Sequence, residues 1–182
     1  VVTKVKQIKS VNKLSDGIKY IEDGAKTIGA ELLDSDLNFP IKFVNGQPVS
    51  QLVSGNLIID VESAYSEMMQ LKQLANLEKG RPINNEELVK NDVLAHHVIQ
   101  SFSPEDNLTP EEINRIGYDT MMELTGGRFK FIVATHTDKD HVHNHILINA
   151  IDSNSDKKLI WNYALERNLR MISDRISKMA GA

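Results

Sequence analysis

Hydrophobic residues at the start of the chain change their period after the first few positions. Residues 1–8 mix β-branched residues and lysines in partial alternation, which predicts a short half-exposed strand. Leu14, Ile18 and Ile21 then recur at helical spacing and predict a short helix. Tyr20 lies roughly 120° from this apolar stripe, at about 100° per residue, so the helix does not need its ring for packing.

The middle of the chain is less regular. Between residues 24 and 60, prolines and glycines interrupt short apolar pieces, which predicts a long loop or flap. A second helix follows, with Asp60 as a candidate cap and Gly80 past its end. Its apolar positions are Val61, Ala64, Tyr65, Met68, Leu71 and Ala75. Residues 81–91 are predicted to be a polar connection.

The second half of the chain carries stronger signals. A buried strand is predicted over residues 93–102, and a helix then begins with Thr109 as N-cap, Pro110 in its first turn and Glu112 completing a capping box. The remaining predicted elements are two apolar strands that form a hairpin, over 128–135 and 142–151, and a last helix over 163–179.

Composition narrows the class of protein. A chain of 182 residues with 41% hydrophobic content fits one globular domain. It has no cysteine, so any metal must be held by nitrogen and oxygen ligands, and a reducing, cytoplasmic setting is expected. No apolar run approaches the roughly 20 residues of a membrane span, and we expect no membrane insertion.

Charge is unevenly distributed along the chain. The formal net charge of −4 argues against nucleic-acid binding, because phosphate contacts come from clustered lysines and arginines. The first twenty residues nevertheless contain a single acid, Asp16, and the lysines Lys4, Lys6, Lys9, Lys13 and Lys19. A second basic group near the end of the chain consists of Lys157, Lys158, Arg167, Arg170, Arg175 and Lys178. The net charge alone therefore decides little about nucleic-acid binding.

Histidines are concentrated at the predicted hairpin, where four of the six fall between residues 136 and 145. Side chains alternate along a strand, so His143 and His145 point the same way, and the preceding strand can bring His136 opposite them. Three neutral imidazoles suit a divalent transition-metal ion and leave coordination positions open for a substrate. The spacing predicts a catalytic metal site, with His141 as a bystander.

Three motifs together resemble a known family. Residues 136–149 fit the pattern H-x-D-x-x-x-x-H-x-H-x-x-x-N and resemble the third motif of conjugative relaxases of the P mobilisation class, within the HUH endonuclease superfamily. Lys19-Tyr20-Ile21 resembles the first motif, which carries the nucleophilic tyrosine, and residues 97–102 resemble the second. The motifs occur in the family's order and span most of the chain.

The resemblance implies an α+β fold, with helices flanking a central antiparallel sheet and a metal site on a strand hairpin. By carry-over, Tyr20 is the nucleophile, Ser101 contacts DNA or the active site, and Asp138 orients a metal-bound histidine or assists proton removal. The implied ligands of one divalent ion, Mg²⁺ or Mn²⁺, are His136, His143 and His145. The residues assigned to DNA binding are Lys13, Lys19 and Asn149.

The activity implied by the resemblance is site- and strand-specific nicking and joining of single-stranded DNA at a transfer origin, through a 5′-phosphotyrosine link. The implied partners are transfer-origin DNA, a type IV secretion coupling protein and accessory DNA-binding proteins. The implied protein is bacterial and cytoplasmic, is exported with the DNA strand, and is longer than this chain, which would be its N-terminal nicking domain.

Two other interpretations stay open. A replication initiator of the same superfamily would use the same chemistry, but initiators usually place the tyrosine after the histidines, where Tyr163 would have to serve. A non-catalytic metal-binding or DNA-binding module belongs to a different class, and Tyr20 would be dispensable in it.

Overall fold

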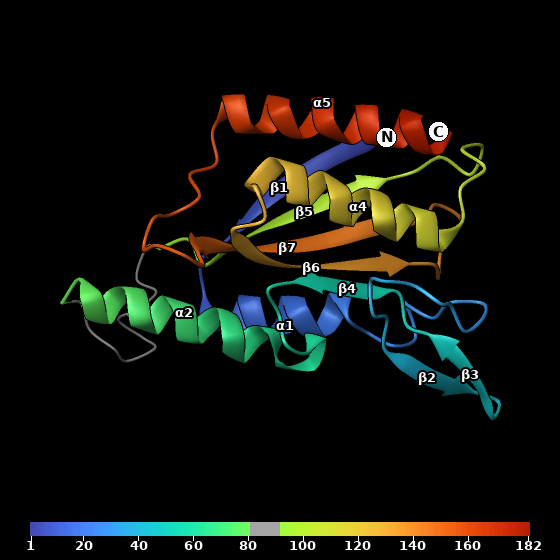
Figure 1. The fold of residues 1–182 in the computed structure, drawn as a ribbon, viewed down its shortest axis with the longest axis horizontal. Helices are drawn as coiled ribbons and strands as arrows, with labels where there is room; N and C mark the ends of the chain where they lie inside the picture. The colour runs from blue at the N-terminus through green and yellow to red at the C-terminus, as the bar shows by residue number, and fades with distance from the viewer. Residues whose placement is uncertain (81–91) are drawn as a thin grey trace.

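The fold is built on one antiparallel sheet (Figure 1). A computed structural model describes residues 1–80 and 92–182, so the polar connection predicted over 81–91 lies outside the described residues. The main sheet has five strands in the order β1-β5-β7-β6-β4, and β2 pairs with β3 in a separate two-stranded sheet. The strands are β1 (Val2–Ile8), β2 (Ile41–Val44), β3 (Gln47–Ser50), β4 (Val53–Asn56), β5 (Ala95–Ser101), β6 (Phe129–His136) and β7 (His143–Asp152).

Helices cover both faces of the main sheet, which confirms the predicted α+β class. The helical segments are α1 (Val11–Ile21), the short 3-10 helix η1 (Val61–Ser63), α2 (Ala64–Glu78), α4 (Pro110–Thr125) and α5 (Tyr163–Ala180). α4 and α5 pack together on one side, and α1 and α2 lie on the other (Figure 1). We call these sides the α4 face and the α1 face. None of the helices in the described residues is long and apolar enough to cross a membrane.

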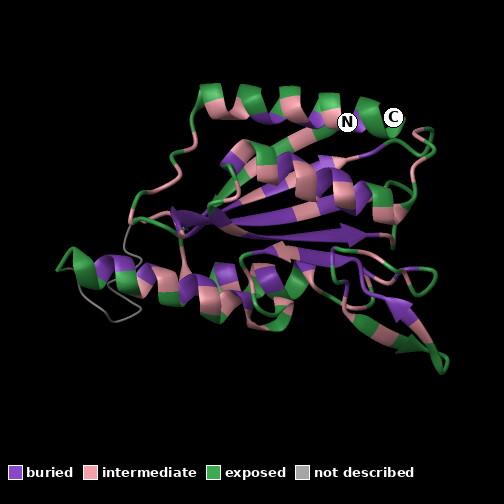
Figure 2. Ribbon diagram, viewed as in Figure 1, coloured by how far each residue is buried: buried purple, intermediate pink, exposed green. Residues whose placement is uncertain are grey.

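Alternation along the inner strands supplies a hydrophobic core on each face. In β6, Ile132 and Ala134 join the core under α1 and α2, whereas Phe131 and Val133 join the core under α4. Figure 2 shows the inner strands as buried along nearly their whole length. Because both faces of these strands are covered, their sequences are continuous apolar runs in which only the polar residues stand out.

One group of these polar residues forms a buried hydrogen-bond network on the α4 face. Asn144 Nδ2 donates to Gln100 Oε1 (3.0 Å), and Thr135 Oγ1 donates to Asn144 Oδ1 (2.7 Å). Asn114 on α4 donates to Thr135 Oγ1 (3.0 Å), and all four residues are 0% exposed. Asn144 stands between His143 and His145 in the sequence. A satisfied network at this depth therefore fixes the strand register that aims the histidines at the opposite face.

The predicted long loop or flap over residues 24–60 is corrected by the structure. This range contains β2 and β3, joined at Asn45 and Gly46, whose φ angles are 51° and 76°. It also contains β4, which pairs with β6 at the edge of the main sheet. An Asn-Gly pair is a local hairpin signal that the sequence does carry. The pairing of β4 has no local signal, because a four-residue strand shows too little alternation and its partner lies far along the chain.

Gly117 lets α4 approach the sheet closely, and its replacement by alanine is expected to cost about 2–4 kcal/mol of stability. An added Cβ would lie 2.6 Å from Asn144 Nδ2 and 2.9 Å from Val133 Cγ1, against the buried network. The matched control is Gly17→Ala in α1, where the nearest atom is Ile8 Cδ1 at 3.9 Å, and a gain of about 0.5–1 kcal/mol is expected from helix propensity. Urea unfolding of both variants provides the comparison. Equal effects of the two substitutions would contradict this account of the packing.

Glu22, at the end of α1, makes the stability depend on pH. Burial, then the nearby Glu62 and Asp60 carboxylates, raise the pKa of Glu22 to about 8, and its Oε1 is buried without a hydrogen bond in the described residues. The folded state therefore holds this proton more tightly than the unfolded state does. Its stabilising contribution is complete below pH 4.5 and is lost as the pH rises towards 8.

Glu22→Gln is accordingly expected to remove part of this pH dependence. The variant should be more stable than the parent by about 1–2 kcal/mol at pH 8, after allowance for solvent screening, and nearly equal to it at pH 4.5. Calorimetric melting at both pH values measures the difference, with the exposed Glu105→Gln as control. A gain of the same size at both pH values would show that relief of carboxylate burial is not the cause.

Candidate active site

The register of three strands assembles the histidines on the α1 face. His143 on β7 lies opposite Ser101 on β5 at one side and opposite His136 on β6 at the other. His145 follows two residues later on the same face, opposite Ile99. The structure thus brings together the three predicted ligands and Ser101, in the arrangement that strand alternation predicts.

Tyr20 reaches this face from α1. The helix begins at the N-cap Ser10 and buries the stripe Leu14, Ile18 and Ile21 against the sheet, which leaves Tyr20 at the rim with 47% of its surface exposed. Its ring stands edge-on to two imidazoles, with centroid distances of 5.4 Å to His136 and 5.8 Å to His145. An exposed phenol is therefore held beside the histidine cluster.

A cavity of about 230 Å³ opens between Tyr20 and the sheet. Its lining combines the predicted site residues with three others, which are Lys4, Ile99 and Lys139. The predicted residues in the lining are Tyr20, Ser101, His136, Asp138, His143 and His145. Lysines from β1 and from the β6–β7 turn thus complete a polar, partly cationic pocket.

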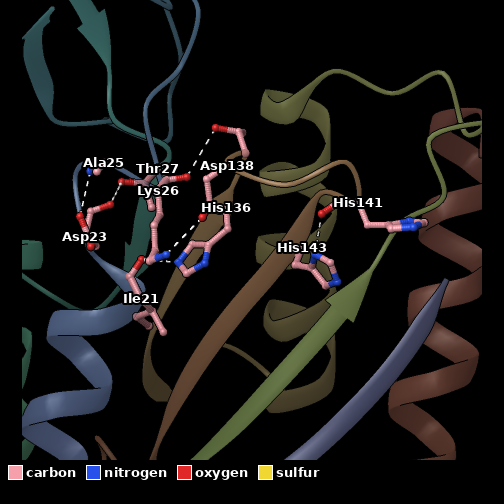
Figure 3. Close-up of polar contacts among 10 residues, drawn as sticks. Ile21, Asp23, Ala25, Lys26, Thr27, His136, Asp138, His141 and His143 are labelled. Atoms are coloured by element: carbon pink, nitrogen blue, oxygen red, sulfur yellow. Dashed lines mark hydrogen bonds and ion pairs between the residues drawn. The ribbon is translucent and has the colours of Figure 1, made fainter.

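Each predicted histidine ligand has one ring nitrogen held by another group. His136 Nε2 lies 2.9 Å from the carbonyl oxygen of Ile21, and His143 Nδ1 lies 2.6 Å from that of His141 (Figure 3). A ring nitrogen donates its proton in such contacts. His145 Nδ1 lies 3.0 Å from His97 Nε2, so one of these two rings donates and the other accepts. Partners of this kind orient the histidines of metal sites.

Burial favours the neutral form of three imidazoles, those of His97, His136 and His145. Burial, followed by the nearby His136, His97 and His143, lowers the pKa of His145 to about 3. Burial, followed by Lys6 and His136, lowers the pKa of His97 to about 4, and burial also lowers the pKa of His136. A metal binds neutral imidazole, so at neutral pH no proton has to be removed from these rings before an ion binds.

This cluster suits a metal ion through the chemical type of its donor atoms, which are imidazole nitrogens. Across residues 1–80 and 92–182, no three histidine, aspartate or glutamate side chains are arranged to hold an ion. Within the same residues, the second nitrogens of His136, His143 and His145 make no hydrogen bond, and all three rings line one cavity. Three such nitrogens are a suitable donor set for one divalent ion. The three residues share one face of two paired strands, which places all three rings at the same cavity.

Asp138 is engaged by a residue that the sequence did not single out. Its carboxylate accepts a hydrogen bond from Lys26 Nζ at 3.1 Å, and this ammonium group lowers the pKa of Asp138 (Figure 3). Lys26 Nζ also stands 5.4 Å from the centroid of the Tyr20 ring. The pairing links the carboxylate to the tyrosine through a cation, and a lowered pKa makes Asp138 a weak base.

The residues assigned to DNA binding differ in their accessibility. Lys13 and Lys19 are exposed on α1, the helix that carries Tyr20. Asn149 is only 1% exposed and lies opposite Ala95, at the opposite end of the β5–β7 pairing from Ser101 and His143. The assignment of Asn149 to DNA contact is therefore corrected, because its side chain has almost no surface to offer a ligand.

Two residues outside the predicted set of site residues contact members of that set. His97 follows from strand alternation, since it lies on the same face as Ser101, four residues earlier on β5. Lys26 had no such signal, because it is separated from Asp138 by 112 residues and belongs to a segment without regular periodicity. Both act on residues already predicted, His97 on His145 and Lys26 on Asp138.

Fold and site together place a histidine-lined cavity on one face of an antiparallel sheet, with a tyrosine at its rim. The chain belongs to the MobA/VirD2-like relaxases, since residues 45–182 match the nuclease domain of that family. The predicted relaxase resemblance is thereby confirmed. The matched range includes Ser101 and the histidine cluster and begins after Tyr20 and Lys26.

Individual relatives agree with this family. The chain is 34% identical over 206 residues to the group II intron-interrupted relaxase LtrB of Lactococcus lactis subsp. cremoris, a match that covers 98% of the chain and 36% of the relative. It is 35% identical over 122 residues to a protein rlx of Staphylococcus aureus, which covers 67% of the chain and 34% of the relative. The chain therefore spans about a third of the length of these curated relatives.

Proposed function

We propose that this domain nicks and rejoins one DNA strand at the transfer origin of a plasmid or conjugative element, by metal-assisted transesterification through Tyr20. The observation that carries the proposal is the position of the Tyr20 ring, 5.4 Å and 5.8 Å from the rings of His136 and His145 at one cavity. A nucleophile and a metal-binding donor set placed this close can act on the same phosphate.

In this proposal His136, His143 and His145 hold one divalent ion, Mg²⁺ or Mn²⁺. When bound, the ion would supply Lewis-acid chemistry to the scissile phosphate. Ser101 lies in the same cavity opposite His143, where its hydroxyl can donate to a phosphate oxygen. Lys13 and Lys19 on α1 are proposed to contact the DNA beside Tyr20.

The covalent step is an exchange of phosphate esters. The Tyr20 oxygen bonds to phosphorus while the bond from phosphorus to the 3′ oxygen breaks, and that oxygen takes up a proton. The products are a 5′-phosphotyrosine and a free 3′-hydroxyl, and the reverse reaction rejoins the strand. Asp138 contributes by holding Lys26 beside the Tyr20 ring, and the phenolic proton passes to solvent as the oxygen attacks.

The remaining partners are part of the same proposal, which the family and the greater length of the relatives support. We include in the proposal that the complete protein stays attached to the DNA strand, is delivered to a type IV secretion coupling protein with the help of accessory DNA-binding proteins, and is exported with the strand. The proposed delivery and export do not require a membrane-spanning helix in this domain.

Incubation with single-stranded oligonucleotides from candidate transfer origins tests the proposal. With Mn²⁺, the cognate strand should give a protein–DNA adduct that survives denaturing electrophoresis and disappears when the metal is chelated. A non-catalytic binding module would retain the oligonucleotide in a native gel and give no adduct under denaturing conditions. That result, obtained across the whole oligonucleotide set, would contradict the proposal.

A further inference from the structure

The α1 face of the sheet continues beyond the cavity as an open strip along β1. Antiparallel pairing places Lys4 opposite Ile99 and Lys6 opposite His97, so both lysines share a face with the site residues of β5. Lys4 lines the cavity itself, and Lys6 is close enough to His97 to lower the pKa of that imidazole. Because β1 is an edge strand of the sheet, both ammonium groups stand at the surface.

The cations of this strip are not engaged in ion pairs within the described part of the chain, a property they share with exposed lysines such as Lys157 and Lys178. Nine other cations do form ion pairs in the described residues, and these are Lys26, Lys42, Lys72, Lys79, Arg115, Arg128, Lys158, Arg170 and Arg175. Among the described residues, Lys4 and Lys6 have no acidic partner, and neither does Lys139 at the mouth of the cavity. The net charge of −4 therefore conceals a local excess of unpaired positive charge beside the site.

The floor of the strip also suits a nucleic-acid strand. Between the β1 lysines and Tyr20 lie His97, Ile99 and Ser101, all only partly buried in the structure. Successive lysines on one face of a strand are spaced about 6.6 Å apart, so the two ammonium groups can reach different phosphates. A groove of this kind combines a cationic edge with a mixed apolar and polar floor.

We propose that Lys4 and Lys6 form a phosphate-binding edge for single-stranded DNA, which leads the strand along β1 into the cavity at Tyr20. This inference rests on the proposed function for its ligand, and it assigns the contacts to β1, outside the predicted motifs. Contacts to phosphate do not read sequence, so the edge should bind any single strand. Lys139 continues the edge at the far side of the cavity.

The double variant Lys4→Gln/Lys6→Gln tests this edge with a fluorescein-labelled oligothymidylate, in anisotropy titrations at salt concentrations from about 50 to 200 mM. Each phosphate contact contributes a slope of about −0.7 to log K against log salt for single strands, so the slope should become less steep by about 1.4. Affinity at the lowest salt should fall by about tenfold. The matched control, Lys157→Gln/Lys178→Gln, removes two exposed lysines that have no ion pair in the described residues, one before α5 and one on α5.

The outcomes separate this inference from the proposed function. An unchanged slope and affinity in the Lys4/Lys6 variant, or an equal loss in the control, would overturn the phosphate edge even if the parent protein forms an adduct. A less steep salt dependence in the Lys4/Lys6 variant, with no adduct from any transfer origin in the parent protein, would support the edge and contradict the proposed chemistry. Melting temperatures of both variants equal to that of the parent would exclude unfolding as the cause of weaker binding.

Discussion

Tyr20→Phe is expected to abolish the covalent protein–DNA product, with a loss of about 10³-fold or more in the rate of adduct formation. The substitution removes only the attacking oxygen. The phenyl ring can keep the edge-on contacts to His136 and His145, so the fold and the affinity for Mn²⁺ should be unchanged. Denaturing electrophoresis of the reaction with a cognate oligonucleotide measures the product.

Tyr163→Phe is the matched control for this experiment. Tyr163 is 80% exposed at the start of α5, on the other side of the sheet, and it is the residue that would have to serve if the tyrosine followed the histidines. Adduct formation should be unchanged in this variant. An adduct that survives Tyr20→Phe and is lost in Tyr163→Phe would reverse the assignment of the nucleophile.

His145→Ala is expected to weaken Mn²⁺ binding by at least about 100-fold, because it removes a ligand that is central to the cluster. The His145 ring contacts the rings of Tyr20, His97 and His136. Isothermal titration calorimetry with Mn²⁺ measures the affinity directly, without DNA. The rise in melting temperature on adding Mn²⁺ should disappear in parallel.

His141→Ala is the matched control, because it removes a histidine of the same cluster that is not a predicted ligand. The group of His141 that holds His143 is the backbone carbonyl, which the substitution keeps. The Mn²⁺ affinity of the His141→Ala variant should therefore stay within a few-fold of the parent value. Equal losses in His141→Ala and His145→Ala would mean that the ion, if bound, is held by a different set of residues.

Positive charge is concentrated beside the site, although the net charge of the domain is negative. Lys26 is fully engaged with Asp138, while Lys4 and Lys6 stand unpaired on the same face among the described residues. The first arrangement holds a cation at the tyrosine, and the second leaves cations available to a polyanion. The acidic residues elsewhere lower the net charge of the domain without neutralising this face.

The elements whose causes are local could be predicted from the sequence alone. The capping box at Thr109 and Glu112 begins α4 as predicted, and the alternation of His143 and His145 sets them on one face of β7. Tyr20 lies off the buried stripe of its helix, as predicted, because a helix fixes side-chain directions over neighbouring turns. In each case the residues that decide the outcome lie within a few positions of one another.

Features that join distant segments depended on the assembled fold. The structure adds β4 to the sheet edge, pairs Lys26 with Asp138 and buries Asn149. None of these follows from periodicity, because each depends on which strands pair and on which loop packs against the finished sheet. The free energy that selects such contacts comes from burial and hydrogen bonding across the whole domain, and a local pattern does not contain it.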